Sequence, residues 1–261
     1  MSDIVDIYTN AIHDNLRPMY ANWQPGLPVQ LGDFGLLDGN HFVHVGNVGT
    51  LGIQFKVRKD TSKDQINFSS KGTTKVTLNA AGSGPAAGGV TVKASLQIDF
   101  SSEESVFFNA AECGYDMIED KAALSAEIMK QFAAGTWDRE WAVITDIVNA
   151  GATTIAVSGG TTSSVVFQAS GNVPQIDLAD ASISFSVVSS SNVALQIAAE
   201  QGLSPLIGLS KIQHTFLFLG NKFSPAMLIN NLGLVNRLQD TIKTDKSVSP
   251  ENPIYFGQFN A

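Results

Sequence analysis

The chain has 261 residues and a formal net charge of −8, and only 15% of its residues are charged. Its hydrophobic content of 44% is ordinary for a globular protein and too high for a disordered one. The negative charge argues against a nucleic-acid partner, because phosphate binding needs clustered Lys and Arg, and it also removes long-range attraction to anionic lipid. The single cysteine, Cys113, excludes an internal disulfide and a Cys-rich metal site.

The first segment, residues 1–16, is expected to form an acidic amphipathic helix. Ile4, Ile7 and Ile12 recur at near-helical spacing, and Pro18 ends the pattern. The segment has no basic region followed by an apolar core, so we expect no secretory signal. No run reaches the roughly 20 apolar residues of a membrane-spanning helix. These features predict a protein made in soluble form, with a cytoplasmic location.

Short strands are expected next, at residues 29–34, 42–48 and 51–57. The first two are separated by residues 38–40, Asp-Gly-Asn, which have the composition of a tight hairpin turn. The charged residues 58–64 predict an exposed loop after the third strand.

Residues 66–100 are expected to form a long hairpin with very little charge. Its flexible tip is the glycine-rich stretch 81–89, and its descending arm, residues 90–100, matches the roughly 9–11 residues of a membrane-crossing strand. Apolar and polar residues alternate along this arm. The apolar positions are Val90, Val92, Ala94, Leu96, Ile98 and Phe100. The pattern fits a sheet with one wet face, and it also fits a hairpin that moves into a bilayer.

An interior helix is expected at residues 118–134, where apolar residues form a stripe and Gly135 marks the end. Residues 140–148 return to a strand. The strands at residues 153–157 and 164–169 are expected to flank a second glycine-containing tip at 158–162. Three more alternating strands are expected, at residues 176–178, 183–188 and 193–197.

The C-terminal region is expected to contain a strand at residues 215–219 and a helix that begins at Ser224 and Pro225. A polar linker, residues 240–253, precedes an unexpectedly apolar segment at residues 254–259.

The fold class expected from these elements is α+β, dominated by strands. We expect a twisted antiparallel sheet with long hairpins, an interior helix and terminal helices. Residues 1–239 are expected to form a single domain, and residues 240–261 a C-terminal tail.

No motif predicts catalysis. His41 and His44 lie three apart in an expected strand, so their side chains point to opposite faces and do not share a metal. No nucleophile elbow or phosphate-binding loop occurs, and Cys113 is expected to be a small buried hydrophobe. We therefore expect a protein that is not an enzyme and that needs no metal or cofactor. Three carboxylates that could converge in an acid–base site are Asp146, Asp177 and Asp180.

The order of these elements resembles the pore-forming domain of gasdermins, including the short bacterial members. The hairpin at residues 66–100 looks like the family's first membrane hairpin, and the helix at 118–134 takes the place of the helix between hairpins. The strand at 141–148 resembles the apolar strand after that helix, and residues 153–169 and 183–188 resemble the second hairpin. The candidate membrane-hairpin residues are Val90, Val92, Leu96, Ile98, Ile155, Val157, Ile183 and Phe185.

The resemblance implies a soluble, autoinhibited monomer that assembles after proteolysis into a ring whose hairpins cross a membrane, as a toxin in bacterial defence. The implied partners are copies of the chain itself, membrane lipid and an activating protease. The protein would move from the cytoplasm to the membrane on activation. Residues 1–20 hold no cysteine of the kind that is lipidated in bacterial members.

The tail is the segment expected to hold the protein inactive. Its apolar end would fill an apolar groove, and cleavage of the polar linker would release it. The residues expected to inhibit are Ile254, Tyr255, Phe256 and Phe259. The candidate cleavage positions are Lys243 and Lys246.

Two other classes of function remain open from the sequence. Alternating strands rich in Ser and Thr also cover stable sheets, which predicts a non-enzymatic structural or binding module that self-assembles. An enzyme would need a pocket that gathers several of the three carboxylates or a histidine.

Overall fold

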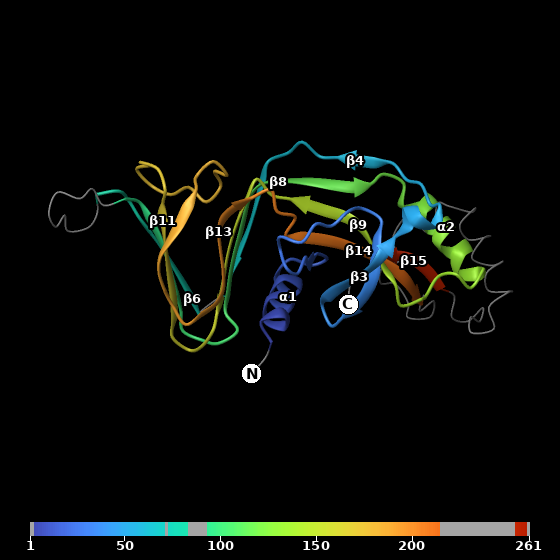
Figure 1. Ribbon diagram of the computed structural model, residues 1–261, viewed down its shortest axis with the longest axis horizontal. Helices are drawn as coiled ribbons and strands as arrows, with labels where there is room; N and C mark the ends of the chain where they lie inside the picture. Colours follow the sequence, from blue (N-terminus) through green and yellow to red (C-terminus); the bar gives the residue numbers. More distant parts are fainter. Residues whose placement is uncertain (1–2, 71–72, 83–92, 215–253, 260–261) are drawn as a thin grey trace, which may run out of the picture.

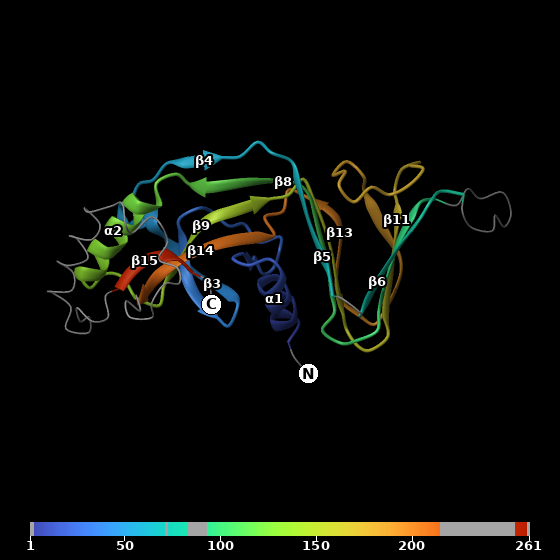
Figure 2. The same cartoon turned by 180° about the vertical axis from the view of Figure 1, so that it is seen from behind.

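The computed structural model describes residues 3–70, 73–82, 93–214 and 254–259 of the chain. These residues form an elongated molecule built from two antiparallel sheets and two α-helices (Figures 1 and 2). The strand-dominated α+β class predicted from the sequence is therefore confirmed.

The larger sheet has eleven strands. They are β1 (Tyr20–Ala21), β2 (Asp33–Asp38), β3 (His41–Asn47), β4 (Val57–Lys59), β5 (Asp64–Ser69), β8 (Val106–Ile118), β9 (Ala142–Asn149), β10 (Ala152–Ser158), β13 (Val193–Gln201), β14 (Leu206–His214) and β15 (Ile254–Gln258). The neighbours along its central path are β1, β14, β9, β8, β10 and β13.

The smaller sheet has four strands in the order β12-β11-β7-β6. They are β6 (Thr74–Asn79), β7 (Ser95–Phe100), β11 (Ser163–Ala169) and β12 (Phe185–Ser191). The helices are α1 (Ile4–Asn15), α2 (Lys121–Ala133) and the short 3-10 helix η1 (Val48–Leu51). Neither α-helix of the described part is long and apolar enough to cross a membrane.

Strand β8 joins the two ends of the molecule. Its first half pairs with β10 and β5, and its second half pairs with β9 and β4. The second half of β8 runs along the long axis with β9 and β14 in Figure 1, whereas β11 and β13 run across it. The part of the larger sheet formed by β5, the first half of β8, β10 and β13 is called the base sheet below.

Both faces of the base sheet pack against other elements, and its central strands, the first half of β8 and β10, are buried. One face packs against α1 in the helix core, where Tyr8 and Ile12 contact a cluster that includes Phe108 and Ile155. The other face packs against the smaller sheet in the sandwich core, which includes Phe107 of β8. A third cluster lies at the opposite end of the molecule, between α2 and the strands beneath it.

Both helices begin at aspartates that cap their first turns. Asp3 accepts a hydrogen bond from the Val5 backbone N–H, and Asp120 accepts one from Ala123. Helix α2 starts later than the sequence predicts, because Ile118 still belongs to β8. The apolar stripe predicted for this helix is confirmed, since Leu124, Ile128 and Met129 are buried.

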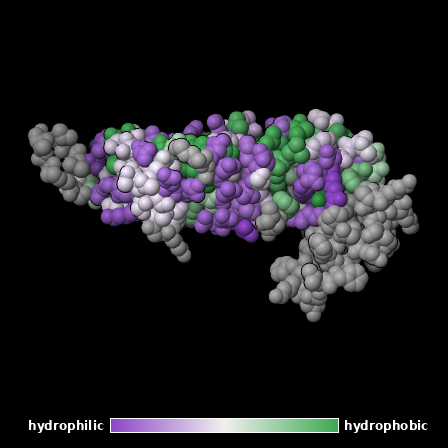
Figure 3. Space-filling model, turned by 90° about the horizontal axis from the view of Figure 1, so that it is seen from below, coloured by the Kyte–Doolittle hydropathy of each residue, from purple (hydrophilic) through white to green (hydrophobic). Residues whose placement is uncertain are grey.

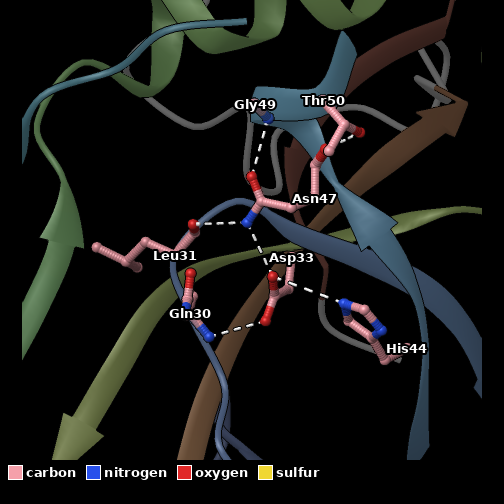
Figure 4. A network of polar contacts seen from close by, with 7 residues as sticks. All are labelled: Gln30, Leu31, Asp33, His44, Asn47, Gly49 and Thr50. Atoms are coloured by element: carbon pink, nitrogen blue, oxygen red, sulfur yellow. Dashed lines mark hydrogen bonds and ion pairs between the residues drawn. The ribbon is translucent and has the colours of Figure 1, made fainter.

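The first hairpin of the chain, β2–β3, turns at residues 38–40 as predicted, but its first strand is Asp33–Asp38 and not residues 29–34. Figure 4 shows the polar network at its base, where Asp33 accepts hydrogen bonds from the Gln30 N–H and the Asn47 amide, each at 2.8 Å. Asn47 also caps η1 by accepting a bond from Gly49 at 2.9 Å. His44 Nε2 lies 3.7 Å from Asp33, so this histidine belongs to the hairpin base.

Several expectations along the chain are wrong. Residues 51–56 form no strand, because the end of η1 and a loop occupy them. The stretch 58–64 is not wholly a loop, because β4 covers Val57–Lys59 and β5 begins at Asp64. Residues 176–178 also lie in a loop. The long strand β8 was not predicted, because it is buried on both faces and lacks a clear alternation of apolar and polar residues. The strand and helix expected at residues 215–238 lie outside the described residues.

An ion pair fixes α2 to the sheet. Lys121 Nζ lies 2.7 and 2.6 Å from the two Asp146 carboxylate oxygens, and both side chains are largely buried. We expect Asp146→Ala to lower the free energy of unfolding by about 1–3 kcal/mol, because it leaves the lysine without its partner. Urea denaturation measures this loss. The control is Lys63→Ala, which removes an exposed ion pair with Glu112 and should cost less than about 1 kcal/mol. Equal effects of the two substitutions would contradict the prediction.

Candidate functional site: a creased double hairpin and a docked C-terminal strand

The smaller sheet has one apolar face and one polar face. Leu96, Ile98 and Phe100 of β7 are buried, and the residues between them are polar and partly exposed. The apolar face continues on β11, where Val165 lies opposite Ile98 and Phe167 lies opposite Leu96. The alternation predicted for the descending arm is therefore confirmed for residues 94–100.

The polar face of this sheet has little charge. Gln97 donates hydrogen bonds to both oxygens of Asp99, at 2.9 and 3.0 Å, and Lys75 of β6 lies directly opposite Asp99 in the pairing. Figure 3 shows the end of the molecule with this sheet as largely pale, and a strongly hydrophilic region lies nearer the middle.

Two long hairpins contribute to both layers. The first runs from β5 to β8: its lower part, in the base sheet, is the β5–β8 pair, and its upper part, in the smaller sheet, is the β6–β7 pair. The second runs from β10 to β13, with β10–β13 as its lower part and β11–β12 as its upper part. Each hairpin bends over between its two parts, so the smaller sheet lies on the base sheet. We call these bends the creases; their described residues are Ser70, Thr73, residues 101–105, residues 159–162 and Asn192.

The two central strands keep one register across the creases. Below the crease, β8 and β10 pair up to Val106 with Val157, and above it β7 and β11 pair from Phe100 with Ser163. Both strands advance by the same number of residues between these two pairs. The Ser158 N–H donates to the Ser105 carbonyl at 2.9 Å, which extends the lower register into the crease. The outer strands carry small offsets and bulges.

The apolar residues of the two layers have the same parity along each strand. On the first hairpin they fall at even positions in both layers, and on the second hairpin at odd positions. In the base sheet these residues lie in the helix core beneath α1, and in the smaller sheet most of them lie in the sandwich core. Val76, Leu78 and Val187, on the outer strands β6 and β12, are 37–40% exposed. The base-sheet set is Ile66, Phe68, Val106, Phe108, Ala110, Ile155, Val157, Leu195 and Ile197. The smaller-sheet set is Val76, Leu78, Leu96, Ile98, Phe100, Val165, Phe167, Ala169, Phe185 and Val187.

The predicted membrane-hairpin residues divide between the two layers. Leu96 and Ile98 lie on β7, and Ile183 and Phe185 join them in the sandwich core. Ile155 and Val157 lie on β10 and face α1 instead. Val90 and Val92 lie outside the described residues. The tip predicted at residues 158–162 is wrong, because β10 and β11 do not pair with each other and this stretch is a crease.

The C-terminal strand β15 is docked on the edge of the larger sheet beside β14. Phe256 is buried against Leu124, Ile128 and Met129 of α2, and its carbonyl accepts a bond from the Ser125 hydroxyl at 3.4 Å. Figure 2 shows β15 next to β14 on the side of the molecule where α2 lies.

Phe259 follows the strand and is also held in place. Its N–H donates to the Leu209 carbonyl at 2.8 Å, its ring stacks on Tyr20, and Lys211 Nζ lies 5.4 Å from the ring centroid. Ile254 and Tyr255 pair through their backbone with His214 and Gln213. Lys243 and Lys246, the predicted cleavage positions, lie outside the described residues.

The candidate acid–base residues serve local structure. Asp146 pairs with Lys121, whereas Asp177 accepts a bond from the Ala179 N–H in a loop of the other sheet. Hydrogen bonds from Ser182 lower the pKa of Asp180, which lies in the same loop. Within the described residues no group of three or more His, Cys, Asp or Glu side chains could hold a metal ion. A surface hollow of about 630 Å³ near the start of α2 contains none of these three carboxylates in its lining.

No family model matches the chain, and no curated protein matches it. Among solved structures, the chain is similar to one in "Cryo-EM structure of the Gasdermin A3 membrane pore". The sequence identity is 9% and the TM-score is 0.34, and the match covers 85% of this chain and 97% of that chain. The match is to the family that the order of sequence elements resembles. At this identity and TM-score it establishes neither a shared family nor a shared function.

Cys113 is buried in the helix core beneath α1, as predicted. Burial raises the pKa of its thiol to about 11, and the nearby Asp64 carboxylate adds to the increase. We expect the folded protein to react slowly with a thiol reagent at pH 8 and faster as the pH approaches 11. Denaturation in urea should make the thiol react at the rate of a free cysteine. Fast reaction of the folded protein at pH 8 would contradict the prediction.

The same pKa has a consequence for stability. The folded pKa lies above the roughly 8.5 of an unfolded thiol, so the neutral buried thiol contributes its full stability below that pH. This contribution is lost as the pH rises toward 11, and Cys113→Ala should lack that part of the pH dependence.

Proposed function

We propose that the protein is a pore-forming protein, not an enzyme, whose double hairpin straightens and inserts into a membrane as part of an oligomer. The observation that carries this proposal is the common register of β7–β11 and β8–β10 across the creases. Because the central strands already share one register, straightening the creases converts two stacked sheets into one continuous sheet without sliding the central pair.

The straightened strands are long enough to cross a bilayer. At about 3.3 Å per residue, a strand from residue 95 to 113 spans roughly 60 Å, and a strand from 152 to 169 spans a similar length. The hydrocarbon core of a bilayer is about 30 Å thick. The remaining length suffices to connect the inserted part to the rest of the molecule.

Straightening also aligns the apolar residues. Side chains of equal parity lie on the same face of a regular strand, so the two apolar sets defined above merge into one face. Lys75, Asp99 and Gln97 fall on the opposite face. A sheet with one apolar and one weakly charged polar face suits a wall between lipid and a water-filled channel. In the folded state α1 covers the base-sheet set, and the sandwich core covers most of the smaller-sheet set.

Insertion requires several copies of the chain. An isolated four-stranded sheet would place the unpaired backbone groups of its two edge strands in hydrocarbon, at a cost of several kcal/mol per group. Pairing the β5–β6 edge of one copy with the β12–β13 edge of the next removes these edges. This contact joins different surfaces, so it generates a ring when the rotation between copies closes. The partners implied are the chain itself and membrane lipid.

The docked C-terminal strand supports a model in which the tail restrains the protein. Release of β15 would expose the edge of β14 and the apolar side of α2 that Phe256 covers. We propose that a protease cuts within residues 240–253 and thereby frees the strand. Before activation the protein is proposed to stay soluble in the cytoplasm.

One observation favours a second candidate, a module that self-assembles without membranes. Val187 and Val188 are exposed on β12, which is an edge of the smaller sheet. Such an edge can pair with another copy in solution. Assembly without lipid, together with vesicles that never leak, would favour this candidate.

The first test of the pore is controlled release of the tail. We expect a chain with an engineered protease site between Lys243 and Lys246 to release dye from phosphatidylcholine vesicles only after cleavage. Phe256→Ala should leak without cleavage, because it removes the side chain that holds β15 against α2. The control is Tyr115→Phe, which leaves β15 untouched. If vesicles stay sealed with every variant, the pore proposal is wrong.

The second test compares the two faces of β6. Val76 is 37% exposed in the folded protein, so Val76→Lys should fold normally. After tail release it should abolish leakage, because a lysine on the lipid side costs about 2–4 kcal/mol near the bilayer centre. Thr77→Lys places the same charge on the opposite face and should leak like the parent chain. Equal leakage by the two variants would show that this face does not meet lipid.

A further inference from the structure

The creases are tied together by buried serine hydroxyls. Ser158 ends β10 and Ser163 begins β11, and each is at most 2% exposed. Their hydroxyl oxygens lie 3.2 Å apart. The Ser158 hydroxyl also lies 2.9 Å from the Ser102 carbonyl and 2.6 Å from the Gly160 carbonyl. The Ser163 hydroxyl lies 2.5 Å from the Asn192 carbonyl. The two side chains thus connect three of the four creases.

These contacts exist only while the hairpins are bent. In a regular strand two residues five positions apart are separated by roughly 17 Å, so Ser158 and Ser163 cannot touch after straightening. Interactions present in only one of two states shift the equilibrium toward that state. The serine cluster therefore stabilises the bent form selectively.

The backbone around the cluster is also specific to the bend. A Cβ on Gly159 would lie 2.7 Å from the Asn192 carbonyl oxygen, which is closer than real Cβ contacts allow. Asn192 itself has a φ of 53°, in the left-handed region. A side chain at residue 159 therefore conflicts with the folded crease, whereas a regular strand accommodates one.

We propose that Ser158, Ser163 and the glycines between them form a clasp that sets how readily the double hairpin straightens. The clasp is separate from the C-terminal strand, which lies at the other end of the molecule (Figure 1). The clasp proposal rests on the proposed function in one respect: straightening of the hairpins is the step before insertion. Loss of the clasp raises the population of molecules with straightened hairpins. Loss of the contact between β15 and α2 acts at the opposite end of the fold.

Spin labels measure straightening directly. Cysteines introduced at the exposed positions Ser189 and Glu200 can be labelled, because the native Cys113 is buried. In a straight strand these positions lie roughly 36 Å apart, and in the bent hairpin they are closer. The samples are the full chain with phosphatidylcholine vesicles, and dye release is recorded from the same vesicles.

The variants separate the clasp from general destabilisation. The double variant Ser158→Ala with Ser163→Ala removes both hydroxyls. Gly159→Ala keeps both hydroxyls and disfavours the bent crease through the added Cβ. Ser186→Ala is the matched control, because its exposed hydroxyl bonds the Gln168 carbonyl within one sheet. Circular dichroism and thermal melting establish that each variant folds, and if the double variant does not fold, Gly159→Ala decides.

We expect the clasp variants to populate the long distance and to leak at least tenfold faster than the parent without tail cleavage. Ser186→Ala should match the parent. The clasp proposal is wrong if the folded clasp variants keep the short distance and leak at the parental rate, both before and after tail release. That result leaves the pore proposal unaffected. A long distance in the clasp variants with vesicles that stay sealed supports the clasp and overturns the pore.

Discussion

Register between the two central strands is the constraint on which the rest of this structure depends. Val106 pairs with Val157 on one side of the creases, and Phe100 pairs with Ser163 on the other, with no slip between them. A spacing that differed by an odd number of residues would put apolar side chains of the two layers on different faces after straightening. The bent form also buries most of these side chains, since α1 and the sandwich core cover them in separate places.

The two restraints of the proposed mechanism lie in different parts of the molecule. The C-terminal strand and α2 form one unit, in which Phe256 packs on the helix and Lys121 ties the helix to Asp146. The creases form the other unit, with serine hydroxyls in place of apolar contacts. Strand β8 connects the two units through continuous backbone, because it belongs to both halves of the larger sheet. In the proposed mechanism, two independent restraints of this kind hold the bent form more securely than either would alone.

The sequence predicts the parts of this arrangement that depend on local pattern. The alternation along β7 is visible because one face is polar, and the turn at residues 38–40 is visible in its composition. The creases are not predictable in this way, because Gly159 and Gly160 mark a bend without revealing that the strands on either side pair elsewhere. Strand β8 is not predictable from the sequence pattern, because both of its faces are buried. Which residues face α1 and which face the sandwich depends on long-range packing.

The parity of the apolar residues limits how this chain can vary in length. Insertion of one residue at 101–105 or 159–162 would turn every later side chain of that strand to the wrong face. The connections between β6 and β7 and between β11 and β12 lie beyond the paired segments, so they bear no such restriction. Insertions and deletions in relatives of this chain should therefore occur at the tips of the hairpins, whereas the creases should change only by substitution.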